Sequence, residues 1–163
     1  MTHLLPTDRA WTIAASAYDN PDARRLTQAL HREQIATYGR ADDPEATEPA
    51  EFDPPRGAFL LAARADGTAL ACAGWRTAAP GTAEIKRMYV DPAARGHGLG
   101  RLLLAALEAD ARQQGMARAI LETGVKNHAA LALYADCGYV PTEPYRAGRD
   151  PRINRALSKT LNE

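Results

Sequence analysis

The 163-residue sequence has no net charge, no long apolar run, few aromatic residues and only two cysteines. Its 20 basic residues balance 20 acidic ones, so no overall field attracts a polyanion, and we expect neither a nucleic-acid nor a membrane partner. No stretch approaches the roughly 18 apolar residues of a membrane-spanning helix, and the first residues lack a basic segment followed by an apolar one. The sequence therefore predicts a soluble, cytoplasmic protein.

The chain also lacks the residue spacings of a metal centre or a disulfide framework. Its four histidines, at positions 3, 31, 97 and 128, show no metal-ligand spacing, so we expect no bound metal. Cys72 and Cys137 lie in apolar stretches and are expected to be small buried side chains in a reducing compartment. Residues 1–163 are expected to form one domain, because this length suffices for one buried core.

The most informative stretch runs from Ala83 to Gly115 and reads AEIKRMYVDPAARGHGLGRLLLAALEADARQQG. It predicts a strand that ends at Asp91-Pro92, then a turn with glycines at 96, 98 and 100, then a helix that Gly115 terminates. The expected buried face of this helix carries Leu99, Leu102, Leu103 and Ala106. The opposite side is expected to carry Arg101, Glu108 and Arg112.

The glycine-rich turn is suited to hold a phosphate group. The first turn of a helix has backbone N–H groups without partners and a partial positive charge, and both favour an anion. Glycines keep side chains out of the way and permit a positive φ, while Arg95 and Arg101 add charge at the two ends of the loop. Such a turn can also serve packing alone, but the flanking arginines favour a pyrophosphate ligand.

The spacing of the glycines distinguishes between known pyrophosphate motifs. A dinucleotide loop needs G-x-G-x-x-G and a Walker loop needs G-x-x-x-x-G-K-[ST], and the chain contains neither. Arg95, Gly98 and Gly100 instead fill the pattern R-x-x-G-x-G, directly after a strand that ends in Met88-Tyr89-Val90. With this motif, residues 58–145 closely resemble the GNAT N-acetyltransferase superfamily, in which the pattern binds the pyrophosphate of acetyl-CoA.

The rest of the chain fits an α/β domain of this kind. Helices are predicted from Asn20-Pro21 to Tyr38 and from Asn127 to Gly138, with an irregular segment at 40–57. Strands are predicted at 11–17, 58–64, 69–77, 82–90, 118–123, 139–140 and 155–161. The unit from 82 to 123 implies a right-handed crossover with parallel pairing. We expect the GNAT (acyl-CoA N-acyltransferase) fold: a mixed, mostly antiparallel sheet flanked by helices, with a central strand-loop-helix-strand parallel unit.

The resemblance implies acetyl-CoA as the co-substrate. Its thioester end would lie where the parallel strands 82–90 and 118–123 splay apart, near a bulge whose backbone N–H groups stabilise the oxyanion. The cofactor-binding residues implied by the resemblance are Met88, Tyr89, Val90, Arg95, Gly96, His97, Gly98, Leu99, Gly100, Arg101 and Asn127. Asn127 would contact the pantetheine arm, although it can also be only the N-cap of its helix.

Transfer of an acetyl group from a thioester to an amine needs a base and a proton donor. A free alkyl amine has a pKa of roughly 10.4 and must lose a proton before it attacks. The family pattern makes Glu84 the candidate base, unless it is a solvent-facing strand residue; His97 and Glu122 are weaker candidates. Tyr134 lies seven residues after Asn127 and is the candidate proton donor to the sulfur, unless it is a core aromatic.

The acceptor is expected to be a primary amine on a small molecule or a peptide. The acidic residues of the 40–57 segment would attract a cationic amine or form only a solvated loop; they are Asp42, Asp43, Glu45, Glu48, Glu51 and Asp53. The basic residues Arg146, Arg149 and Arg152 would bind a carboxylate or phosphate of the acceptor, or be solvated. Direct attack is expected, because neither cysteine lies where a nucleophile would. The alternative is a non-catalytic acyl-CoA-binding module, and the resemblance leaves a homodimer open.

Overall fold

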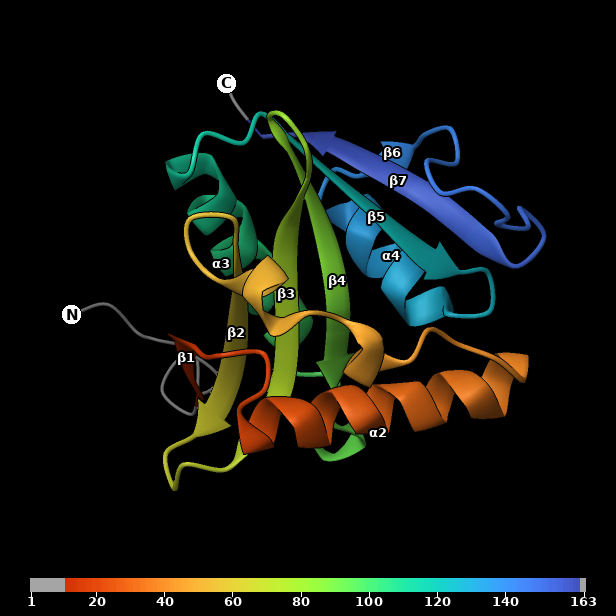
Figure 1. The fold of residues 1–163 in the computed structure, drawn as a ribbon. Helices are drawn as coiled ribbons and strands as arrows, with labels where there is room; N and C mark the ends of the chain where they lie inside the picture. The colour runs from red at the N-terminus through yellow and green to blue at the C-terminus, as the bar shows by residue number, and fades with distance from the viewer. Residues whose placement is uncertain (1–10, 162–163) are drawn as a thin grey trace.

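The computed structural model describes residues 11–161, and a seven-stranded sheet forms their centre (Figure 1). The strand order is β1-β2-β3-β4-β5-β7-β6. The strands are β1 (Trp11–Ala15), β2 (Gly57–Arg64), β3 (Ala69–Ala79), β4 (Thr82–Val90), β5 (Arg118–Gly124), β6 (Val140–Pro141) and β7 (Asn154–Thr160). Among these strands only β4 and β5 pair in parallel, so the expected mixed, mostly antiparallel sheet is confirmed. The N-terminal segment without a leader pattern, and His3, lie outside the described residues.

Helices cover both faces of the sheet (Figure 1). They are α2 (Pro21–Tyr38), α3 (Leu99–Gln113) and α4 (His128–Asp136), with short 3₁₀ turns η1 (Pro44–Ala46), η2 (Pro49–Phe52) and η3 (Pro92–Ala94). Side chains of α3 and α4 share one buried cluster, and side chains of α2 and η2 share another on the opposite face. None of the helices in residues 11–161 is long and apolar enough to cross a membrane.

Helix α2 begins and ends at the residues that its capping pattern predicts. The Asn20 side chain accepts a hydrogen bond from the Asp22 N–H at 2.9 Å, and Pro21 occupies the first helical position, where its missing N–H costs nothing. Gly39 adopts a left-handed conformation with φ 78°, and its N–H donates to the Ile35 carbonyl at 2.8 Å. These local contacts set the length of α2, which spans the sheet.

The α2 face of the sheet is packed by three aromatic rings. Tyr18 stacks on Phe52 with ring centroids 4.9 Å apart, and Phe59 meets both rings edge-on. Gly74 on β3 lies directly beneath them, and a Cβ there would lie 2.7 Å from the Phe59 ring and 2.8 Å from the Phe52 ring. This packing anchors the segment that carries η2 against β3.

The buried face of α3 includes one charged residue that the helical pattern placed on the opposite side. The Glu108 side chain is only 6% exposed. It accepts hydrogen bonds from the Tyr139 hydroxyl and from the Lys159 ammonium, both at 2.8 Å. The prediction was wrong because an ion pair to β7 offsets the cost of burying the carboxylate, and helical periodicity contains no information about that partner.

Several predicted boundaries and buried positions also shift. β1 ends two residues before the predicted Ala17. β6 begins at Val140, because Tyr139 is buried and hydrogen-bonded to Glu108. Cys72 is fully buried as predicted, but Cys137 is only partly buried. These differences leave the element order and the parallel unit unchanged.

Candidate functional site

Strands β4 and β5 pair over only three positions and then separate. The last pair joins Glu84 to Ile120. Beyond it β5 continues against β7 as far as Gly124, whereas the following residues of β4 pair only with β3. Figure 1 shows the two strands diverging toward their C-terminal ends. The gap expected between the two parallel strands is therefore present.

β4 contains a bulge just beyond this fork. Between the pairs Cys72–Tyr89 and Gly74–Lys86, β4 has one more residue than β3. Arg87 has a left-handed φ of 60°, which is uncommon for a residue other than glycine. The bulge interrupts the ladder with β3 beside the gap, where a strand partner on the β5 side is also missing.

The glycine-rich turn lies between β4 and α3. Gly96 and Gly98 have φ angles of 83° and 77°. Gly98 is the N-cap of α3 and contributes no side-chain cap, so the first N–H groups of α3 are left for a ligand or solvent. The Leu99 side chain is buried, so only its backbone can face a ligand, while a Cβ on Gly100 would lie 3.2 Å from Leu133. The turn thus has the geometry of an anion site.

Each arginine beside the turn has an acidic partner. The Arg95 guanidinium contacts Glu33 of α2 at 2.7 Å and donates to the Val90 carbonyl at 2.8 Å. Arg101 lies 3.6 Å from Asp136 at the end of α4. Both side chains remain about half-exposed at the rim, so the backbone N–H groups are the more direct anion donors. The predicted His97 lies within the turn, where its ring contacts the Ala94 carbonyl at 3.3 Å.

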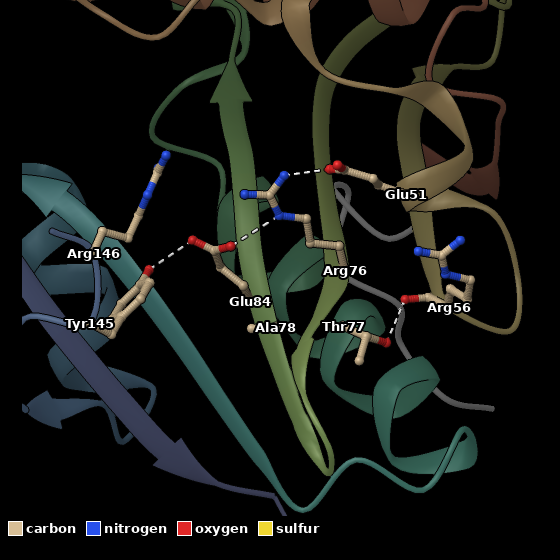
Figure 2. A pocket seen from close by; sticks show the side chains of 8 residues that line it. All are labelled: Glu51, Arg56, Arg76, Thr77, Ala78, Glu84, Tyr145 and Arg146. Carbon is tan, nitrogen blue, oxygen red and sulfur yellow. Dashed lines mark hydrogen bonds and ion pairs between the residues drawn. The ribbon is translucent and has the colours of Figure 1, made fainter.

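Glu84 lies in the wall of a cavity of about 390 Å³ (Figure 2). Its side chain is only 5% exposed, so the alternative of a solvent-facing strand residue is wrong. The carboxylate accepts hydrogen bonds from Arg76 Nε and from the Tyr145 hydroxyl, both at 3.0 Å. Arg76 also pairs with Glu51 of η2. Residues of β3, β4, η2 and the loop between β6 and β7 therefore meet at the cavity around the Glu84 carboxylate.

The pKa values of the titratable groups around Glu84 are shifted by burial and by the charges of neighbouring groups. Burial, followed by the charge of Glu84, raises the pKa of Tyr145, so this hydroxyl stays protonated and donates. Burial alone would lower the pKa of Arg76, but Glu84 and Glu51 outweigh it and raise the pKa overall. Burial lowers the pKa of Lys86 to about 8; the charge of Glu84 opposes this shift, and the nearby arginines add to it.

Tyr134 and Asn127 both lie on α4, as predicted from their spacing. Tyr134 is buried and packs edge-on against Tyr139 with centroids 5.8 Å apart, so its ring belongs to the core. Its hydroxyl has no hydrogen-bond partner among the described residues, and burial raises its pKa. Asn127 caps α4, since its side chain accepts from the Ala130 N–H at 3.2 Å.

The basic loop after β6 is neutralised by acids from elsewhere in the chain. Arg149 contacts Asp42 at 2.8 Å and Glu122 at 3.3 Å, and Arg146 shares both acids at 3.2 and 3.6 Å. Burial would raise the pKa of Asp42, but Arg149 and Arg146 outweigh it and hold that pKa below its usual range. Arg152 pairs with Asp150 at 3.1 Å. Glu122, one alternative base, is therefore held in ion pairs.

The sequence reasoning missed Arg76 and Tyr145, the two residues that hold Glu84. Arg76 lies opposite Glu84 in the register of β3 and β4, so a register assigned to the predicted hairpin could have found it. Tyr145 lies 61 residues away in a loop between prolines, and no sequence signal points to it. Residues 11–161 contain no group of three or more His, Cys, Asp or Glu side chains that could hold a metal ion.

Comparison with known proteins relates this geometry to a family. The sequence pattern described as "Acetyltransferase (GNAT) family" matches residues 20–139, which include β4, the glycine turn and α4. An uncharacterized N-acetyltransferase of Schizosaccharomyces pombe is 34% identical over 138 residues, 83% of this chain and 85% of that protein. An IAA acetyltransferase of Azospirillum brasilense is 40% identical over 94 residues, 56% of this chain and 61% of that protein. A crystal structure described as "the putative acyl-CoA N-acyltransferase" from Klebsiella pneumoniae has a TM-score of 0.80 and 32% identity, covering 93% of this chain and 98% of that one.

Proposed function

The chain belongs to the acetyltransferase (GNAT) family, and we propose that it transfers the acetyl group of acetyl-CoA to a primary amine by direct attack. It is an enzyme of the acyltransferase class, and its relatives include a named N-acetyltransferase. One arrangement supports the proposal most directly. A gap opens between β4 and β5, the glycine turn follows the end of β4 at the open side of this gap, and the Glu84 cavity lies near the point where the two strands separate.

The glycine turn would hold the pyrophosphate of acetyl-CoA. The N-terminal N–H groups of α3 lack a side-chain cap, and the helix dipole favours negative charge there. From the turn, the pantetheine arm would run along the edge of β4 from Val90 to Met88, where β4 has no β5 partner. Asn127 would contact this arm beside its capping role. These residues fit an extended diphosphate ligand.

Glu84 would act as the base. The acceptor amine enters from the cavity and loses its proton to the Glu84 carboxylate, directly or through a water molecule. Arg76 and the Tyr145 hydroxyl hold this carboxylate in place from two sides, which keeps the base in one orientation before the substrate arrives. The free amine then attacks the thioester carbonyl, and the backbone N–H groups at the β4 bulge would stabilise the oxyanion.

Tyr134 would protonate the leaving thiolate. A tyrosine hydroxyl is protonated at neutral pH, and that of Tyr134 forms no hydrogen bond with a described residue, so its proton is available to the sulfur. The amine ends as an amide and the sulfur as the thiol of CoA, so the step needs no covalent intermediate on the protein. One relative is named as an aminoglycoside N-acetyltransferase, and we propose that the acceptor here is also a small amine.

A thiol-release assay with acetyl-CoA and a broad set of amines tests the proposal. We expect CoA release that depends on the amine, and we expect Glu84→Gln to lower kcat by about 100-fold or more, because the amide cannot take the proton. Calorimetric titration with CoA is the companion measurement and should give the same affinity for both proteins. CoA binding without amine-dependent release from wild type would contradict the enzymatic proposal and indicate a binding module.

A further inference from the structure

The charges that line the Glu84 cavity are separated rather than mixed. Arg76 is shared by two acids, Glu51 and Glu84, so this group of three has more negative than positive charge. Arg146, which also lines the cavity, shares its two acids with Arg149, and that group is balanced. The remaining charged residue of the lining, Arg56, has no acidic partner among the described residues.

Arg56 is held at the cavity by its backbone, although its side chain is exposed. The Arg56 carbonyl accepts two hydrogen bonds from Thr77 of β3, from the N–H at 2.9 Å and from the hydroxyl at 2.8 Å. The Arg56 N–H donates to the Asp53 carbonyl at 2.9 Å. The following Gly57 packs so closely that a Cβ there would lie 2.4 Å from the Trp75 carbonyl. The backbone of Arg56 is thus fixed at the cavity wall, and its side chain is exposed there (Figure 2).

A negative group around Glu84 and a lone positive charge at Arg56 match a molecule that carries both charges. We infer that the acceptor is an amino-acid-like zwitterion, whose ammonium group lies at Glu84 and whose carboxylate binds Arg56. This inference rests on the proposed function, because it names the substrate class of the same site. A volume of about 390 Å³ lies within the range of small-molecule sites, about 300 to 1,000 Å³.

The chemistry of Arg56 favours a carboxylate over a phosphate. One guanidinium without an acidic partner balances one unit of negative charge, and its planar pair of N–H donors matches the two oxygens of a carboxylate. The predicted anion-binding loop at Arg146, Arg149 and Arg152 is unsuited to this role, because each of these arginines already pairs with an acid. Arg56 therefore determines which amines bind in the cavity and takes no part in the chemical step.

The test compares amino acids with the amines that lack only the carboxyl group. Suitable pairs are L-phenylalanine with 2-phenylethylamine, L-leucine with 3-methylbutylamine, and L-lysine with 1,5-diaminopentane, each assayed by CoA release. For a reacting pair, the wild-type protein should prefer the amino acid. Arg56→Gln should raise KM for the amino acid by about 10- to 100-fold, with kcat and the matching amine unaffected. Arg56→Lys should recover part of the loss, because it restores the charge without the planar fork.

Arg64→Gln is the matched control, since Arg64 is at the other end of β2, where its guanidinium lies 5.9 Å from the centroid of the Trp11 ring. It should leave both members of each pair unchanged. The inference is overturned if amines without a carboxyl group react as well as the amino acids, or if Arg56→Gln affects both members of a pair equally. Absence of CoA release from every compound would instead contradict the proposed function itself.

Discussion

The side chains of the candidate site differ in whether they have hydrogen-bond partners. Glu84 has two fixed donors, whereas the Tyr134 hydroxyl and the Lys86 ammonium have no partner among the described residues. Among the buried side-chain N and O atoms of the described residues only Arg87 Nε lacks a hydrogen-bond partner, so the Tyr134 hydroxyl and the Lys86 ammonium are unpaired but not sealed off, and a ligand can reach them.

Replacing Tyr134 by phenylalanine separates the proton donor from the core aromatic. The ring and its contact with Tyr139 remain, and the deleted hydroxyl has no hydrogen bond to lose within residues 11–161. We expect kcat to fall by about 100-fold, with little change in acetyl-CoA affinity or in the free energy of unfolding. Steady-state kinetics, calorimetry and urea unfolding measure the three quantities. Unchanged turnover would remove Tyr134 from the mechanism.

Lys86→Met tests the cost of a partly buried ammonium. The Lys86 pKa is about 8 in the folded protein and roughly 10.4 in an unfolded chain, so below pH 8 both states are charged and burial destabilises only the folded one. The cost disappears as pH rises from about 8 toward 10.4. The variant should be more stable than wild type at pH 7, and the difference should shrink by pH 10. Urea unfolding at pH 7 and pH 10 measures the difference in stability between the two proteins. A difference that does not change with pH would contradict the lowered pKa of Lys86.

At the scale of elements, the β4–turn–α3 unit combines a strained strand and a relaxed loop. Arg87 bears the left-handed conformation inside β4, while Gly96 and Gly98 adopt such conformations in the turn at little cost. The bulge frees backbone groups beside the gap, and the turn frees backbone groups at the start of α3. The same unit therefore presents backbone donors at both places where the proposed ligand has negative or developing negative charge.

Gly98→Ala tests the turn, with Gly81→Ala as its control. Both glycines have positive φ, 77° and 74°, and a Cβ at either position meets no protein atom within 4 Å. Each variant should lose about 1 kcal/mol of stability from the left-handed backbone. Only Gly98→Ala should weaken CoA binding, because its methyl group occupies space meant for the pyrophosphate. Calorimetry with CoA and urea unfolding measure both effects. Equal CoA affinities for the two variants would argue against the turn as the phosphate site.

At the scale of the whole molecule, segments far apart in the chain are joined by ion pairs on both sides of the β4–β5 gap. On one side Arg146 and Arg149 link the loop after β6 to Asp42 beyond α2. On the other, Lys159 of β7 reaches Glu108 of α3, 51 residues earlier. These contacts connect the C-terminal part of the chain to α3 and to the loop after α2.

Lys159→Met tests the buried link. It leaves the Glu108 carboxylate with the Tyr139 hydroxyl and a distant Arg112 contact of 3.8 Å, so we expect a loss of about 3 kcal/mol in the free energy of unfolding. The double variant Lys159→Met with Glu108→Gln should recover part of the lost stability, because the unpaired carboxylate charge of Glu108 is then removed. Lys126→Met, at an exposed lysine, should change stability little. Urea unfolding compares the four proteins, and equal effects at positions 159 and 126 would contradict a structural ion pair.

Features that depend on residues close together in the chain could be predicted before the fold was known. The caps of α2 at Asn20 and Gly39, the glycine turn, and the parallel unit from 82 to 123 follow from local sterics, missing N–H partners and helical spacing. Glu84 and Tyr134 were identified through the resemblance to the family, and their roles stay predictions. Such motifs can be recognised in a sequence because the interactions that form them join residues only a few positions apart.

The surroundings of those residues depend on the folded chain and could not be predicted. The fold brings the Tyr145 hydroxyl to the Glu84 carboxylate, 61 residues away in the chain. It buries Glu108, which helical periodicity had assigned to the exposed side of α3. It also pairs the arginines of the loop after β6 with acidic residues. It leaves Arg56 at the cavity wall with no acidic partner within residues 11–161. The physical reason is that electrostatic contacts depend on distance in space, and that distance exists only once the sheet has brought remote segments together.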